Sequence, residues 1–204
     1  MFDQVYTFLE NNNLISPEHH GFLKQRSTNT AIQQLLDIWL KAADEGKLSA
    51  AVLLDLSAGF DVVNHDILIK KMKLYGFDDL SLTWFTNYLK GRVQCVQIES
   101  SFSEFLSVPW GVPQGSILGP LLFILFIMEL PDIVKRTNDV NENDSEQEMT
   151  DMNEEDTENE SENHNIIVYA DDNTPTTSNS DPIILQSEIE NDTKIVTDWF
   201  TKND

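Results

Sequence analysis

The sequence predicts an α+β fold in which helices back a small antiparallel sheet. Three observations predict it: apolar residues recur at helical spacing in several segments, short apolar or alternating runs are typical of strands, and one long segment lacks large apolar side chains almost completely. With 204 residues and 40 % apolar content, the chain is long enough to bury a core. We therefore expect one folded domain with one segment outside its core.

The charge of the chain is concentrated in that segment. The chain has 13 Lys and Arg against 35 Asp and Glu, a net charge of -22. Residues 1–136 carry 11 basic and 15 acidic residues, residues 137–164 none and 12, and residues 165–204 2 and 8. This balance argues against strong nucleic-acid binding by the chain alone, because neutralised phosphates supply much of that affinity. Residues 137–164, the acidic run, are predicted to be disordered because they bury too little apolar surface.

Six segments show the apolar spacing, caps or stop residues of α-helices. The most apolar one is too short to span a bilayer and is expected to be buried. Lys70, Lys71 and Lys73 belong to another, and we expect them on a solvent-exposed face. The predicted helices are residues 2–10, residues 28–45, residues 64–75 with Asn64 as N-cap, residues 81–89 with Ser81 as N-cap, residues 117–128, and a last helix that opens at Asp181-Pro182.

Short apolar or alternating segments predict the strands. Residues 50–56 are apolar and suit a strand buried on both faces. Residues 92–99 and 103–108 alternate and predict a strand pair. Residues 166–170 are apolar and lead into Asp171-Asp172-Asn173, a cluster that favours turns, so we expect the tip of a β-hairpin there.

Cysteine and histidine usage excludes some kinds of site. The single Cys95 rules out an internal disulfide and a cysteine-built zinc site, and it is compatible with a reducing compartment. His19 and His20 have no second pair of ligands at metal spacing and are expected to be loop histidines. No basic segment followed by an apolar run is visible near the N-terminus. We expect an intracellular protein, in the nucleus, the cytoplasm or both, without membrane attachment.

Three carboxylates stand at the ends of predicted strands: Asp55 ends one, and Asp171 and Asp172 follow another. Nucleotidyl transfer to a 3′ hydroxyl uses two divalent cations about 4 Å apart, and magnesium prefers carboxylate oxygens. Rigid strands that meet at one point supply such oxygens. Taken separately, each residue has a simpler explanation, a soluble strand end for Asp55 and an acidic turn for the pair.

Four blocks carry a family resemblance. They are H-H-G-F-L-K-Q-R-S-T at residues 19–28, L-L-D-L-S-A-G-F-D-V-V-N-H-D-I-L at 53–68, G-V-P-Q-G-S-I-L-G-P-L-L-F at 111–123, and Y-A-D-D at 169–172. In this order they resemble the reverse transcriptase domain of non-LTR retrotransposons, especially the jockey-like class, over almost the whole chain outside the acidic run. The Y-A-D-D block alone is a weak signal, whereas the thirteen-residue block is far more specific.

The resemblance implies roles for the carboxylates and for one aromatic residue. Asp55 and Asp171 would hold two Mg²⁺ or Mn²⁺ ions, Asp172 would complete the cluster, and the carbonyl of Leu56 would add an oxygen ligand. Phe60 matches the aromatic ring that blocks a ribose 2′ hydroxyl and so selects deoxynucleotides. A core phenylalanine is the alternative for Phe60.

The resemblance also implies contacts to the nucleotide and the primer. Lys24 and Arg26 match the region that approaches the incoming triphosphate, although a plain surface pair explains them equally well. Gln114 and Gly115 match a loop whose backbone approaches the nascent base pair. Tyr169 would pack near the primer end, with a core tyrosine as the alternative.

The implied architecture is a polymerase palm with partial fingers. We expect partial fingers at 1–46, the first part of the palm at 47–136, the acidic run at 137–164 as an insertion, and the catalytic hairpin with its following helix at 165–204. The thumb is expected to be absent. The chain departs from the family at Leu23, where Arg is usual, and at Ala58-Gly59, where Lys-Ala is usual. The acidic run is either a genuine insertion or an error in the gene structure.

The implied function is RNA-directed DNA synthesis by two-metal nucleotidyl transfer. The expected partners are an RNA template with a DNA primer and deoxynucleoside triphosphates. We expect the fragment to be inactive alone. Two alternatives stay open: an inactive truncated relic that keeps the fold, and an interaction protein whose acidic run binds basic proteins.

Overall fold

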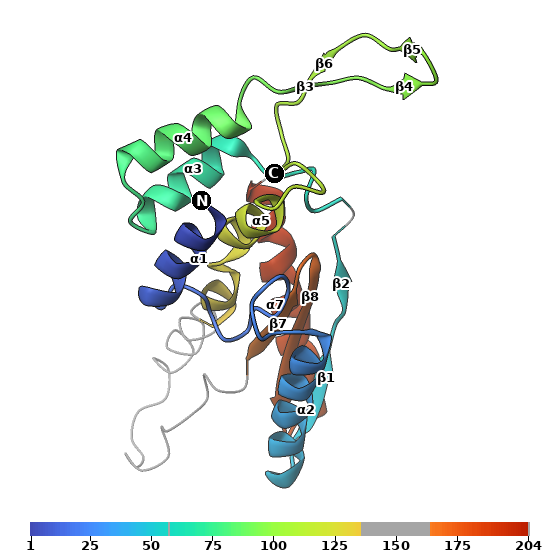
Figure 1. Cartoon of the computed structure of the whole chain (residues 1–204). Coiled ribbons are helices and arrows are strands. Elements are labelled where there is room, and N and C mark those ends of the chain that lie inside the picture. The colour runs from blue at the N-terminus through green and yellow to red at the C-terminus, as the bar shows by residue number, and fades with distance from the viewer. Residues whose placement is uncertain (57, 136–163, 204) are drawn as a thin grey trace. The chain divides into compact units, whose positions relative to one another are not determined.

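The computed structural model describes residues 1–56, 58–135 and 164–203 (Figure 1). The chain divides into two compact units. The helical unit consists of Met1–Leu14 and Ser57–Ile127 with the C-terminal residues from Asn203, and the sheet unit consists of Ile15–Leu56 and Met128–Lys202. Mixed helices and small antiparallel sheets confirm the predicted α+β class.

The sheet unit is built around one central strand. Strand β8 (Asp172–Asn179) pairs on one side with β7 (Asn165–Tyr169) and on the other with β1 (Leu48–Ala51) and β2 (Leu54–Asp55), always antiparallel. Helix α2 packs against β1, β7 and β8. Figure 1 shows α2 alongside these strands. The sheet therefore brings the end of β2 and the start of β8 side by side.

The strand predicted at residues 50–56 is present as β1 and β2, but its predicted burial on both faces is wrong. Leu53 is 83 % exposed and Leu48 is 51 % exposed. Among the described residues this strand has β8 as its only partner, so it lies at an edge of the sheet. An apolar sequence alone does not distinguish an edge strand from a central one.

Strand β8 itself was not predicted beyond its first residues, which were assigned to a turn. Its sequence D-N-T-P-T-T-S-N is polar and contains Pro175, which normally argues against a central strand. Hydrogen bonds of Thr176 explain part of the burial of β8. The Thr176 hydroxyl donates to the Ala50 carbonyl at 2.9 Å and accepts from the Trp39 indole N–H at 2.9 Å. Buried polar groups with partners of this kind are tolerated in a core.

Two helices of the sheet unit begin at side-chain caps. Helix α2 (Thr28–Asp44) starts after Ser27, which forms a capping box with Thr30. Helix α7 (Pro182–Asn203) starts after Asp181, whose carboxylate accepts from the backbone N–H of Ile183 at 2.7 Å. Both helices were predicted from their sequence patterns, and both are confirmed.

His164 is the last residue of the acidic run, and its side chain is buried. Its Nδ1 lies 2.9 Å from Oδ2 of Asp192 on α7, and both side chains are buried. The prediction of disorder was therefore wrong for His164. Residues 137–163 lie outside the described residues.

The helical unit has a continuous apolar core. It contains α1 (Phe2–Asn11), α3 (His65–Leu74), α4 (Asp79–Leu89) and α5 (Gly119–Ile127), and α3 packs against both α4 and α5. Seven consecutive residues of α5, from Leu121 to Ile127, are buried, as predicted for the most apolar segment. Asp78 caps α4 by accepting from the Ser81 backbone N–H at 2.7 Å, so the prediction of Ser81 as the cap is wrong.

A long β-hairpin extends from the helical unit (Figure 1). Its strands form two short ladders: β3 (Val93–Gln94) pairs with β6 (Leu106–Ser107), and β4 (Gln97–Ile98) pairs with β5 (Ser101–Phe102). The predicted strand pair is confirmed, with an interruption between the two ladders. All residues in these four strands are exposed.

Lys71 was expected on a solvent-exposed face, and that expectation is wrong. Lys71 is 5 % exposed, its ammonium donates to the Phe126 carbonyl at 2.8 Å, and the same ammonium lies 4.6 Å from the centre of the Phe126 ring. The carbonyl belongs to the last turn of α5. Lys71 therefore ties α3 to the end of α5.

We expect Lys71→Met to lower the free energy of unfolding of the helical unit by about 1–3 kcal/mol, because it leaves the buried Phe126 carbonyl without this donor. The same substitution at the exposed Lys70 is expected to change it by less than about 0.5 kcal/mol. Urea unfolding of both variants, followed by circular dichroism, measures the difference. Equal effects at the two positions would contradict the structural role of Lys71.

Candidate active site

The predicted carboxylates gather at one end of the sheet unit. Asp55 at the end of β2 is the direct cross-strand partner of Asp172 at the start of β8. Asp172 is in turn the partner of Tyr169 at the end of β7. Because direct cross-strand partners project from the same face of a sheet, Tyr169, Asp172 and Asp55 form one row across three strands.

Asp171 lies in the two-residue turn that joins β7 to β8. Ala170, the other turn residue, has a positive φ of 59°, which is uncommon for a residue with a side chain. The Asp171 carbonyl accepts from the Asn173 side-chain amide at 3.0 Å and from the Leu56 backbone N–H at 3.4 Å. These two hydrogen bonds hold the turn. Leu56 therefore contacts Asp171, and the resemblance assigns both residues to the same metal site.

The electrostatics of Asp172 reflect its acidic neighbours. Burial raises the pKa of Asp172 above its ordinary value, and the negative charges of Asp171 and Asp55 raise it further. Like charges opposing one another across a strand pair destabilise the sheet. Such a cluster of carboxylates favours any bound cation that neutralises it.

We expect Asp172→Asn to stabilise the chain at pH 7, in the presence of a chelator, by about 0.2–1 kcal/mol, because it removes one of the opposed charges. A carboxyl with a raised folded-state pKa destabilises the fold at pH values above that pKa. This effect disappears below the ordinary value of 3.8, where the group is protonated in both states.

The difference in unfolding free energy between Asp172→Asn and the original chain is thus expected to be largest near neutral pH and to shrink as the pH falls towards 3.8. Urea titrations at several pH values measure it. A difference that grows as the pH falls would show that the charge on Asp172 stabilises the fold.

The donor set at this end of the sheet has the chemistry that a magnesium ion prefers, namely carboxylate oxygens. Within residues 1–56, 58–135 and 164–203, however, no three Asp, Glu, His or Cys side chains already form an arrangement that fits a metal ion. The strands bring the backbones of Asp55, Asp171 and Asp172 together.

The first block of the resemblance, residues 19–28, lies against the hairpin. The backbone N–H of His20 donates to the Val168 carbonyl at 2.7 Å, and that of Val168 donates to the Glu18 carbonyl at 2.9 Å. Burial lowers the pKa of His19 to about 4, so this side chain is neutral at physiological pH. His20 hydrogen-bonds Thr30 and Gln34 on α2. The surroundings of both histidines therefore indicate a structural role.

Arg26 and Lys24 have different surroundings. Nη1 of Arg26 donates to the carbonyls of Ser16 (2.7 Å), Pro17 (3.2 Å) and His19. Lys24 is exposed. The guanidinium of Arg26 thus holds the loop that precedes α2 in the chain. The triphosphate contacts predicted for Lys24 and Arg26 stay predictions.

Phe60, Gln114 and Gly115 belong to the helical unit. Phe60 stacks on Phe123 of α5, with ring centres 4.7 Å apart and ring planes 21° from parallel. The Phe60 carbonyl accepts from the Val112 N–H at 2.8 Å, and the Gln114 amide donates to the Asp61 carboxylate at 3.3 Å. The second and third blocks of the resemblance therefore lie side by side.

Glycines shape the loop that carries Gln114. A Cβ on Gly111 would lie 2.9 Å from the Asp61 backbone, so the close approach of the two blocks requires glycine there. Gly115 has a positive φ of 76°, with nothing within 4 Å of the place of its Cβ. Gly115 is therefore favoured for its backbone conformation rather than for lack of space.

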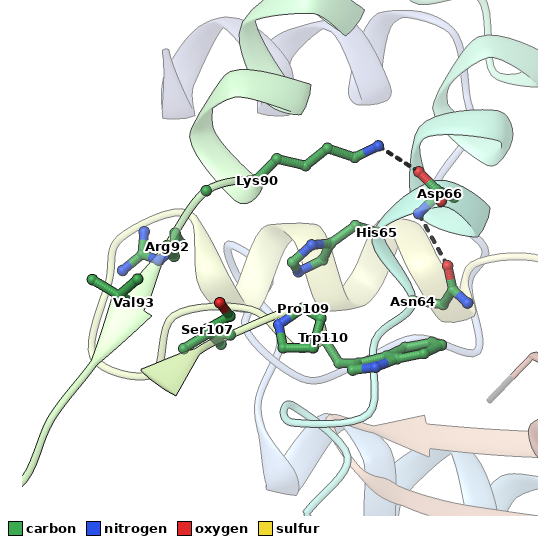
Figure 2. A pocket seen from close by; sticks show the side chains of 11 residues that line it. Asn64, His65, Asp66, Lys90, Arg92, Val93, Ser107, Pro109 and Trp110 are labelled. Atoms are coloured by element: carbon green, nitrogen blue, oxygen red, sulfur yellow. Dashed lines mark hydrogen bonds and ion pairs between the residues drawn. The ribbon is translucent and has the colours of Figure 1, made fainter. Parts of the chain in front are cut away.

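The helical unit also contains a pocket of about 490 Å³ that the sequence did not predict (Figure 2). Figure 2 shows His65, Trp110 and the Lys90–Asp66 ion pair, whose Nζ–Oδ1 distance is 2.7 Å, at its walls. Nε2 of His65 hydrogen-bonds the Gly111 carbonyl at 2.7 Å. No site residue predicted from the sequence lines this pocket.

Residues 2–204 match the family described as "Reverse transcriptase (RNA-dependent DNA polymerase)". The match covers nearly the whole chain, and the chain belongs to this family. The paired strand ends that carry Asp55 and the Y-A-D-D hairpin lie within it.

Several curated relatives come from fruit-fly mobile elements. The chain is 37 % identical over 118 residues to "Probable RNA-directed DNA polymerase from transposon BS" of Drosophila melanogaster, covering 57 % of this chain and 13 % of the relative. It is 35 % identical over 121 residues to the corresponding X-element protein and 30 % identical over 111 residues to the polymerase of mobile element jockey, both from the same fly. These matches cover 57 % and 54 % of this chain and 13 % and 12 % of the relatives.

These similarities support the predicted jockey-like reverse transcriptase domain. They favour neither an inactive relic nor an acidic interaction protein, and nothing supports the binding of basic proteins by the acidic run. The matched region spans about an eighth of each of these relatives. In the described parts of the chain, no helix has the length and apolar character needed to cross a membrane.

Proposed function

We propose that this chain forms the palm and part of the fingers of an RNA-directed DNA polymerase that extends a DNA primer on an RNA template. Family membership and the mobile-element relatives support the reaction class. The single observation that carries the proposal is the pairing of Asp55 with Asp172, directly beside Asp171 in the hairpin turn.

Asp55 and Asp171 would hold two divalent cations, Mg²⁺ or Mn²⁺, with Asp172 completing the carboxylate set and the Leu56 carbonyl as a further oxygen ligand. When bound, such cations activate a 3′ hydroxyl and stabilise the charge of a triphosphate leaving group. Strand pairing sets the backbones of Asp55 and Asp172 opposite one another, and Asp171 lies next to Asp172 in the turn. Tyr169, in the same row as Asp172 and Asp55, would pack near the primer end.

The remaining predicted residues would bind the incoming deoxynucleoside triphosphate. Phe60 would exclude a ribose 2′ hydroxyl, and its stack on Phe123 supports this role because the stack fixes the ring. Gln114 and Gly115 would approach the nascent base pair. Lys24 and Arg26 would face the triphosphate, and Lys24 lies on the surface.

The test uses a chimera in which these 204 residues replace the matching part of the transposon BS polymerase. We expect extension of a DNA primer on an RNA template that requires Mg²⁺ or Mn²⁺ and stops when a chelator is added. The 204-residue chain is assayed in parallel. A folded chimera without metal-dependent extension would contradict the proposed function.

A further inference from the structure

Residues 18–21, the edge segment, follow the edge of β7 that does not pair with β8. His20 and Glu18 exchange backbone hydrogen bonds with Val168, and His19 pairs with Val168 in a parallel bridge. The edge segment therefore attaches to the sheet through a single parallel bridge. Its last residue, Gly21, reaches the hairpin turn.

Gly21 packs directly on the backbone of that turn. A Cβ on Gly21 would lie 2.3 Å from the Ala170 nitrogen, 3.0 Å from the Ala170 Cα and 3.1 Å from the Tyr169 carbonyl carbon. Real Cβ atoms do not approach other atoms to 2.3 Å, and backbone cannot swing aside as a flexible side chain can. Any side chain at residue 21 must therefore displace the turn or the edge segment.

Side chains outside the hairpin hold the edge segment in place. Arg26 donates to the carbonyl of His19 within the segment and to those of Ser16 and Pro17 just before it. His20 hydrogen-bonds Thr30 Oγ1 at 2.9 Å and Gln34 Oε1 at 2.6 Å on α2. Glu18 is paired with Lys135. With the edge segment fixed at these points, the hairpin turn is the part that moves when space is lost.

We propose that Gly21 is a positioning residue for the carboxylates of Asp171 and Asp172. The absence of a side chain at residue 21 lets the turn close onto the edge segment, and this contact sets where Asp171 lies relative to Asp55. The turn is thereby fixed between Gly21 on one side and the Leu56 N–H on the other. The inference rests on the proposed function, since the carboxylates matter here as cation ligands.

The test measures Mn²⁺ binding to the 204-residue chain by electron paramagnetic resonance and records the backbone amide NMR signals of residues 170–173. We expect Gly21→Ala to weaken Mn²⁺ binding at the site about 10- to 100-fold, as for the loss of other groups that orient metal ligands. The amide signals of residues 170–173 are expected to shift even in the absence of Mn²⁺.

The matched control is Gly46→Ala in the same unit. Gly46 has a positive φ of 75°, so alanine is strained there, but nothing lies within 4 Å of the place of its Cβ. We expect a loss of stability with unchanged Mn²⁺ affinity and unchanged signals for residues 170–173. Equal Mn²⁺ affinity in Gly21→Ala and the original chain would overturn the positioning role and leave the proposed function standing.

A second variant keeps the inference testable if Gly21→Ala does not fold. Arg26→Lys keeps the positive charge, but its ammonium lies one bond nearer the backbone than Nη1, the nitrogen that binds all three carbonyls, so it loosens the edge segment without adding atoms beside the turn. We expect Mn²⁺ binding to weaken about tenfold, the lower end of the range for groups that orient metal ligands, with the same amide signals shifted. Unshifted signals in a folded Arg26→Lys variant would overturn the inference, whereas an original chain without site-specific Mn²⁺ binding would overturn the proposed metal site as well.

Discussion

Asp171→Asn is expected to reduce primer extension by the chimera at least about 10²–10³-fold, with the fold retained. Asparagine has nearly the same size as aspartate, and the Asp171 contacts that the structure records use its backbone carbonyl. The substitution therefore removes a charge that the proposed cations need and leaves the turn intact. Single-turnover extension of a labelled DNA primer on an RNA template measures the loss.

The matched control is Asp181→Asn at the start of α7. Asp181 accepts hydrogen bonds from Ile183 and Ile184, and asparagine caps helices equally well. This variant loses one carboxylate of the same unit outside the proposed site, so its extension rate is expected to stay within about twofold of the original. Similar losses for Asp171→Asn and Asp181→Asn would contradict a specific role of Asp171.

Phe60→Val is expected to lower the preference of the chimera for deoxynucleotides over ribonucleotides about 10- to 100-fold. A bulky ring forced against a 2′ hydroxyl costs about 1–3 kcal/mol, and the shorter side chain relieves it. The stack on Phe123 holds the Phe60 ring in one orientation, which is what steric exclusion requires. Competing incorporation of dCTP and CTP opposite the same template base measures the ratio.

Phe60→Tyr keeps the ring and is the control for this substitution. Its preference for deoxynucleotides is expected to stay close to that of the original, while Phe60→Val also loses stability because its stack on Phe123 is gone. Comparing extension with dCTP alone separates a loss of stability from a change in selectivity. An unchanged ratio in Phe60→Val would make Phe60 a packing residue only.

The sequence predicted the elements whose signals are local. Helices α2, α5 and α7 follow from apolar spacing and from caps such as Ser27 and Asp181, because helical periodicity is set within a few turns of one segment. The hairpin turn at Asp171 was predicted from its turn-forming residues. The proximity of Asp55 to Asp172 was expected from their family blocks, and the strand register places them opposite one another.

The features that were missed depend on partners far away in the chain. Strand β8 is polar, and Thr176 is accommodated in the core by Trp39 and Ala50, which lie more than 120 residues earlier. Lys71 is buried, and its hydrogen-bond partner, the Phe126 carbonyl, lies 55 residues later in the chain. The close approach of Gly21 to the turn at Ala170 has no local signal in the sequence. Only the folded backbone shows these contacts.

The most direct test of the shared carboxylate site is Mn²⁺ titration of the isotopically labelled chain, followed by loss of backbone amide NMR signals. A Mn²⁺ ion broadens the signals of nearby residues first, so it distinguishes the hairpin from the acidic run within one sample. We predict that the signals of Asp55, Asp171 and Asp172 disappear at the lowest Mn²⁺ concentrations. Selective broadening of residues 137–163, with these three signals unchanged until saturation, would contradict a cation site built by the three aspartates.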